Sequence, residues 1–205
     1  MKLLWLCLMA SSIAHADDAP EMQLMSAMMR CPAISADGTH VAIYSQAPGS
    51  AKDSKTSLAV FSIKGAEEQR LSVVPPATDQ KRAASDAGAV TKLLDAGQYK
   101  RMGRVKRVDE SFKDGKLVTH VESGDASLAI ELTGRKLTIT GKRGDAKVAL
   151  SKSLPAKDGA CAKADSYSVP NTLAGYDDKT HTFAFSIQVE NDKSICHSHD
   201  FVVVL

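Results

Sequence analysis

The sequence predicts a mainly β fold of the α+β class, built from antiparallel β-hairpins and a meander with one amphipathic helix. Near both ends of the chain, β-branched and apolar residues form short runs bounded by Gly, Asp and Pro. In the middle, apolar and polar residues alternate, and turn residues recur about every ten positions, which is typical of an antiparallel meander. One further segment has the three- and four-residue apolar spacing of a helix.

Four short strands are predicted in the first third of the chain, at residues 33–35, 40–45, 57–63 and 69–74. Asp37 and Gly38 form the first turn, and a polar stretch separates the second strand from the third. Pro75 and Pro76 end the fourth strand, because proline has no amide hydrogen to donate to a neighbouring strand.

The helix is predicted next, with Thr78 or Asp79 as its N-cap and Gly97 at its end. Its apolar residues recur at steps of three and four and are Ala83, Ala84, Ala87, Val90, Leu93 and Leu94. This spacing indicates one apolar face that packs on a sheet.

From residue 104 to residue 150 the apolar period changes to two, which predicts the meander. The residues expected to point inward are Leu128, Ile130, Leu132, Leu137, Ile139, Val148 and Leu150. Turns are expected at residues 114–115, 123–125, 134 and 141–144, where Gly and Asp gather.

The first 16 residues have the pattern of a cleavable signal peptide. Lys2 is followed by an apolar run and then by the small residues Ala14 and Ala16 around a cleavage site. We therefore expect an exported chain, periplasmic or secreted, in which residues 17–205 form a single mainly β domain. No later apolar run approaches the roughly 20 residues that a membrane-spanning helix needs.

Charge is unevenly distributed along this chain. Without Lys2, 25 Lys and Arg face 24 Asp and Glu, but residues 100–152 hold 13 basic and 7 acidic side chains. The densest basic cluster consists of Lys100, Arg101, Arg104, Lys106 and Arg107. It is either a solvated sheet face or an anion-binding surface for lipid headgroups, acidic polysaccharide or an acidic envelope protein. Nucleic acid is not expected, because Tyr99 is the only aromatic residue of the cluster.

Three cysteines follow the predicted cleavage site, so an exported chain leaves at least one unpaired. Cys161 and Cys196 both lie in polar, loop-like surroundings, whereas Cys31 begins an apolar strand. A disulfide between Cys161 and Cys196 is the favoured pairing.

We expect the protein to have no cofactor. As an alternative, two segments could hold a soft metal ion. Cys196, His197 and His199 offer thiolate and imidazole ligands for copper or zinc, and His40 and His181 could approach them if the terminal hairpins pack side by side. The alternative is a disulfide cysteine beside two solvated histidines.

The second segment is methionine-rich, with Met22, Met25 and Met28 at three-residue steps. Thioethers in such an array suit monovalent copper. The same spacing is typical of one packed apolar helix face, which is the favoured interpretation.

The chain lacks the sequence signatures of common catalytic sites, such as a Gly-x-Ser-x-Gly elbow, a His-Glu-x-x-His motif or a phosphate-binding loop. The lack of these signatures, together with the expected export, favours a non-catalytic binding or interaction module of the cell envelope. A periplasmic copper- or zinc-binding protein and an envelope hydrolase are the alternatives.

An internal repeat is the most specific pattern. The segment DGTHVAIYS at residues 37–45 aligns without gaps with DKTHTFAFS at residues 178–186. The stretch PAISADGTHVAIYS resembles the WD-like repeats of the periplasmic Tol-system propeller, and the layout of the chain resembles a family of predicted secreted bacterial proteins of unknown function. The resemblance implies propeller-blade-like hairpins, with a sandwich as the alternative, and it implies no activity. A complete propeller needs at least four such blades, and only two copies are present.

Overall fold

The computed structural model describes residues 20–47, 55–74, 78–154, 166–170, 174–191 and 194–205, so the predicted signal peptide lies outside the described residues. The elements in chain order are α1 (Pro20–Met29), β1 (Ala33–Ile34), β2 (His40–Ala47), β3 (Lys55–Ser62), β4 (Glu67–Val73), α2 (Gln80–Ala96), β5 (Lys100–Arg101), β6 (Gly103–Arg104), β7 (Lys106–Lys113), β8 (Lys116–Ser123), β9 (Ala126–Thr133), β10 (Lys136–Arg143), β11 (Ala146–Ser153), β12 (Ser166–Ser168), β13 (Gly175–Asp177), β14 (Thr182–Asn191) and β15 (Ser194–Val204).

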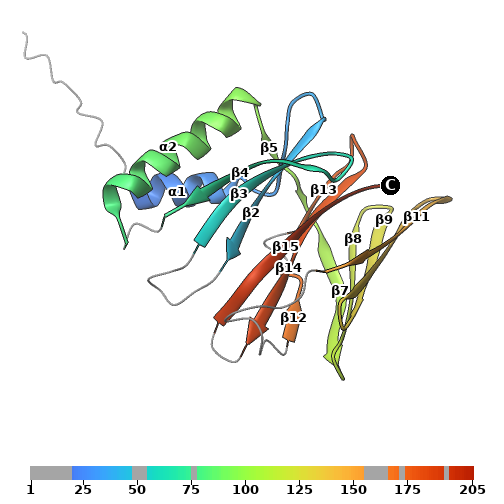
Figure 1. Cartoon of the computed structure of the whole chain (residues 1–205). Coiled ribbons are helices and arrows are strands. Elements are labelled where there is room, and N and C mark those ends of the chain that lie inside the picture. The colour runs from blue at the N-terminus through green and yellow to red at the C-terminus, as the bar shows by residue number, and fades with distance from the viewer. Residues whose placement is uncertain (1–19, 48–54, 75–77, 155–165, 171–173, 192–193) are drawn as a thin grey trace, which may run out of the picture.

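These strands form three antiparallel sheets, which confirms the predicted mainly β fold. The first sheet has the order β4-β3-β2-β1-β5, and the meander sheet has the order β11-β10-β9-β8-β7. In the central sheet, β14 pairs with β15 along one edge and with β12 and β13 along the other, and β6 extends the sheet beyond β13. The two helices cover the first sheet, and the central sheet lies between the first sheet and the meander sheet (Figure 1). The sheets therefore stack in layers as in a sandwich.

Alternation along the strands divides the interior into three cores. In β2, Ala42 and Tyr44 pack under the helices, whereas Val41 and Ile43 pack toward the central sheet. In β14, Ala184 faces the first sheet, whereas Phe183 and Phe185, which flank it in the sequence, face the meander sheet. The central sheet thus packs against another sheet on each of its two faces.

The predicted helix is confirmed as α2, and Asp79 is its N-cap. The carboxylate of Asp79 accepts a hydrogen bond from the backbone N–H of Arg82, and the N–H of Gly97 donates to the last turn. The residues of α2 that are buried against the first sheet are Ala83, Ala87, Val90 and Leu94. Small alanines at two of these positions let the helix lie close to the strands.

A second helix, α1, packs beside α2 and covers the methionine-rich segment, where the favoured interpretation of the spacing expected a helix. Its buried residues are Leu24 and Ala27, and Met28 contributes only partly to the core. Met22 and Met25 are exposed instead. The interpretation of the methionine spacing as the packed face is therefore wrong for these two residues, because Leu24 and Ala27 occupy that face.

The meander is confirmed in both its period and most of its turns. All the inward-facing residues predicted from the alternation are buried or partly buried on the side of the central sheet. Asp114 and Gly115 both have positive φ, as a two-residue hairpin turn of type I′ requires. The last turn is shorter than expected, because Gly141 lies inside β10, where a Cβ atom would come within 2.2 Å of the Leu205 side chain.

The repeated segments occupy equivalent positions in two different sheets. Each begins with a turn and continues into a long strand that forms a hairpin with the next strand, β2 with β3 and β14 with β15. Ile43 and Ala184, which are aligned in the repeat, belong to the same core between the two sheets. The turns also meet, since a Cβ atom on Gly38 would lie 2.8 Å from Thr180 Cγ2. The two copies therefore pack face to face.

No helix in the described part of the chain is long and apolar enough to cross a membrane.

We expect Phe185→Ala to lower the free energy of unfolding by about 3–5 kcal/mol, because the ring is fully buried between the central and meander sheets. Val108→Ala is the control, since Val108 is exposed, and its effect should stay below about 0.5 kcal/mol. Urea unfolding followed by circular dichroism measures both. Equal losses in the two variants would contradict the layered core.

Candidate functional site

The predicted basic cluster lies on an extended segment that links all three sheets. After α2, β5 pairs with β1 at the edge of the first sheet, β6 pairs with β13 at the edge of the central sheet, and β7 is the edge strand of the meander sheet. In Figure 1 this green segment leaves α2 and runs past the central hairpin to the meander. We call residues 99–107 the edge segment.

Three buried side chains anchor the edge segment, one in each core. Tyr99 packs under the helices, Met102 lies between the first and central sheets, and Val105 lies between the central and meander sheets. The backbone is fixed as well, since the N–H of Met102 donates to the Pro32 carbonyl at 2.9 Å. Because the anchors recur at every third position, the two residues between successive anchors point to solvent.

Three of the basic residues occupy these intervening positions, and the fourth, Lys106, directly follows the last anchor. Lys100, Arg101, Arg104 and Lys106 are exposed, and none forms an ion pair with another described residue. We call these four residues the basic ribbon. Four of the five residues predicted for an anion-binding surface are therefore exposed along the edge segment.

Arg107, the fifth predicted residue, has a different role. It is half-buried, and its Nη1 lies 2.5 Å from Oε1 of Glu110. The other oxygen of Glu110 accepts a hydrogen bond from the Val169 N–H at 3.0 Å. Arg107 thus belongs to a local network that joins β7 to the chain after β12, and its charge is already compensated.

A second polar site lies between the first and central sheets, and sequence reasoning missed it. The carboxylate of Asp200 accepts a hydrogen bond from Ser186 Oγ at 2.7 Å and lies 3.5 Å from Arg70 Nη2. Arg70 also donates to Ser57 Oγ at 2.7 Å, and Ser57 lies 3.5 Å from Ser45 Oγ. Ser45 and Ser186 are the last residues of the two repeated segments. Their alignment is the one sequence signal that could have pointed to this site.

Burial controls the electrostatics of Asp200. Its side chain is only 1% exposed, and loss of hydration raises the pKa of the carboxyl, although Ser186 and Arg70 oppose this shift. A cavity of about 240 Å³ opens beside it, with Lys152 and His199 among its lining residues.

The serines and Asp200 do not form a Ser-His-Asp triad with His199. Residues opposite each other on paired strands share a face, and His199 pairs with Ile187, which packs toward the meander sheet. Asp200 pairs with Ser186 on the opposite face. The two adjacent residues of β15 therefore project to different sides of the central sheet.

The Cys-His metal candidate is only partly described. The side chains of Cys196 and His197 lie outside the described part of the structure, and His199 is half-buried. The carbonyl of His181 accepts a hydrogen bond from the N–H of Leu205, just after the end of β15. Leu205 is six residues from His199, or roughly 20 Å along an extended chain, so His181 does not approach His199. No group of three or more His, Cys, Asp or Glu residues in the described ranges is arranged to hold a metal ion.

Cys31 is buried and hydrogen-bonds weakly to the Ala27 carbonyl, with a distance of 3.9 Å between Sγ and the oxygen. Desolvation raises the pKa of its thiol to about 12, although Arg30 and Arg101 lower it slightly. Cys161 and the side chain of Cys196 lie outside the described residues, so the disulfide between them stays a prediction.

Comparisons with protein-family models, with curated proteins and with solved structures found no match to this chain. The resemblance to WD-like repeats therefore also stays a prediction.

We expect Asp200→Asn to become more favourable relative to the parent protein as pH rises. The raised pKa means that the folded state prefers the neutral carboxyl, so the parent loses stability as pH rises from 3.8 through the raised value. Asn cannot ionise and still offers an oxygen to Ser186. Urea unfolding of both proteins at several pH values between about 4 and 7 tests this. If the free energy of unfolding of Asp200→Asn minus that of the parent stays constant or falls as pH rises over that range, the prediction is wrong.

We expect Cys31 to react with iodoacetamide only after unfolding, because the thiolate is the reactive form and the thiol is both buried and hard to ionise. Mass mapping of the peptide that contains Cys31, after labelling at about pH 8 with and without denaturant, separates this thiol from the other cysteines. Rapid labelling of the folded protein would show that the thiol is accessible.

Proposed function

We propose that the chain is a non-catalytic binding module whose basic ribbon holds a linear polyanion. The observation that carries this proposal is a row of four exposed cations, without ion pairs to described residues, along the edge of three stacked sheets. Unpaired like charges repel one another, and a bound polyanion removes that repulsion.

The shape of the ribbon favours a polymer over a small anion. Lys100 and Lys106 are six residues apart on an extended segment, so the row is roughly 20 Å long. A single phosphate or carboxylate can contact only one part of such a row, whereas a chain of repeated acidic groups can contact all of it. The buried anchors Tyr99, Met102 and Val105 hold the backbone, so binding has to order only the basic side chains.

An acidic polysaccharide is the partner class that fits best with an exported protein. Nucleic acid fits less well, because Tyr99, the one aromatic side chain of the edge segment, is buried and offers no surface for base stacking. A hydrolase is less favoured, because His199 and Asp200 project to opposite faces of the central sheet.

Binding to polygalacturonate, measured by titration calorimetry at low and moderate salt, tests the proposal. We expect the variant Lys100→Gln, Arg101→Gln, Arg104→Gln, Lys106→Gln to lose affinity by at least about fourfold, since four exposed ion pairs of roughly 0.2–1 kcal/mol each contribute about 0.8–4 kcal/mol. Added salt should weaken binding of the parent protein, because it screens exposed charges.

The matched control changes the same number of charges elsewhere, with Gln replacing Lys64, Lys81, Lys92 and Lys179, all of which are exposed. This control should bind like the parent protein. Equal losses in the two variants would show that net charge alone attracts the polymer, and no binding by the parent would overturn the proposal. Single-stranded DNA serves as a second polyanion, and tighter binding to it would replace the polysaccharide as the partner class.

A further inference from the structure

Helix α1 exposes three large apolar side chains to solvent. Met22, Met25 and Met29 are 56%, 58% and 63% exposed. The core beneath the helix is filled by Leu24 and Ala27, with Met28 partly buried against it. The three exposed methionines are therefore not needed for packing, and they make an apolar surface that needs another explanation.

The three residues lie on one side of the helix. Positions i, i+3 and i+7 of an α-helix fall within an arc of about 60°, and they span roughly 10 Å along the axis. Met25 lies between the other two, and unbranched methionine side chains are flexible enough to converge above it. We call Met22, Met25 and Met29 the methionine stripe.

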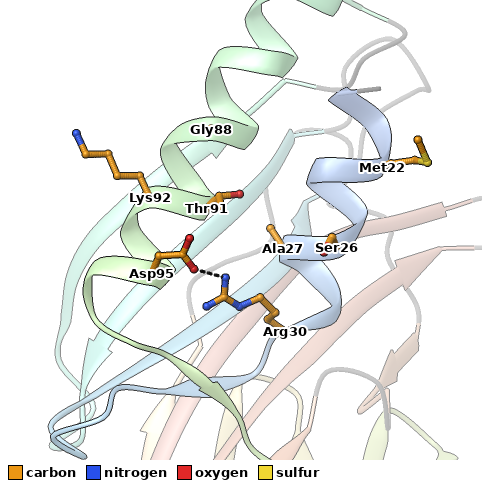
Figure 2. A pocket seen from close by; sticks show the side chains of 8 residues that line it. All are labelled: Met22, Ser26, Ala27, Arg30, Gly88, Thr91, Lys92 and Asp95. Carbon is orange, nitrogen blue, oxygen red and sulfur yellow. Dashed lines mark hydrogen bonds and ion pairs between the residues drawn. The ribbon is translucent and has the colours of Figure 1, made fainter. Parts of the chain in front are cut away.

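The helix that carries the stripe is held in place. The guanidinium of Arg30 donates to Asp95 on α2 at 2.6 Å and to the Tyr99 carbonyl at 3.3 Å. Figure 2 shows Arg30 reaching across to Asp95, whereas Met22 points away from α2. The stripe thus projects to solvent from a fixed helix and leaves the contact between the helices intact.

We propose that Met22, Met25 and Met29 form a surface site for a soft monovalent metal ion, with copper(I) as the matching ion. Thioethers are soft, neutral ligands, and three of them suit a low-coordinate copper(I) ion better than a divalent ion with harder preferences. The set differs from the one expected from sequence, since Met29 takes the place of Met28. This site is separate from the basic ribbon and does not depend on the function proposed for it.

Thioether coordination has a property that separates it from the thiol and imidazole ligands of the same chain. A thioether has no proton to lose, so its affinity for copper(I) should change little between about pH 7 and pH 5. Cysteine and histidine ligands must be deprotonated, so a site built from them weakens as pH falls. Cys31 in particular is buried, with its Sγ 3.9 Å from the Ala27 carbonyl oxygen.

The experiment is an anaerobic titration with copper(I), using bicinchoninate as a coloured competitor, at both pH values. We expect one copper(I) per chain, and an affinity that falls by about tenfold or more in Met25→Leu, since Met25 is the central ligand. Leucine has a similar size and helix propensity, so the helix should persist, which far-ultraviolet circular dichroism checks.

Met28→Leu is the matched control, because it removes a thioether from the same helix but from its partly buried side. This variant should bind copper(I) like the parent protein. Three results would overturn the proposal: no copper(I) bound, equal losses in Met25→Leu and Met28→Leu, or loss of binding at the lower pH in protein that remains folded. The last result would assign the metal to cysteine or histidine ligands instead.

Discussion

Burial of the central sheet on both faces is the constraint on which the rest of the structure depends. Phe183 and Phe185 of β14 pack toward the meander sheet, while Ala184 between them packs toward the first sheet. A strand with large residues on one side and small residues on the other can lie between two sheets only in one orientation. The positions of the other layers follow, because each has to cover one of these two faces.

The same layering explains why the basic ribbon lies where it does. A strand within one sheet points every second residue to the same face, but the edge segment passes from one layer to the next and inserts a side chain into each core in turn. Tyr99, Met102 and Val105 therefore recur with a period of three. The residues between them cannot enter a core, and at these positions the chain places cations that stay hydrated.

Sequence patterns gave correct predictions where one residue's environment follows from its neighbours. The meander strands and α2 are of this kind, since alternation, turn glycines and a helix cap are all local signals. The period of three in the edge segment is typical of neither a helix nor a strand, so the sequence showed a basic cluster without its geometry. Likewise, the spacing of the methionines fits either face of α1, and only Leu24 and Ala27 in the core decide between them. Gly141 resembles a turn residue until the distant Leu205 is seen to lie against it.

The polar site around Asp200 depends on contacts that no local pattern contains. Its groups come from β2, β3, β4, β14 and β15, which meet only when the two repeats pack face to face. Burial of a carboxylate is unfavourable by itself, and its hydrogen bonds to Ser186 and Arg70 only partly offset the lost hydration. A one-residue slip of β15 would turn Asp200 into the apolar core on the other side of the sheet, where these partners are absent. The buried carboxylate thus penalises the wrong register more than the right one, and this is how a locally unfavourable group helps to fix the stacking of the two sheets.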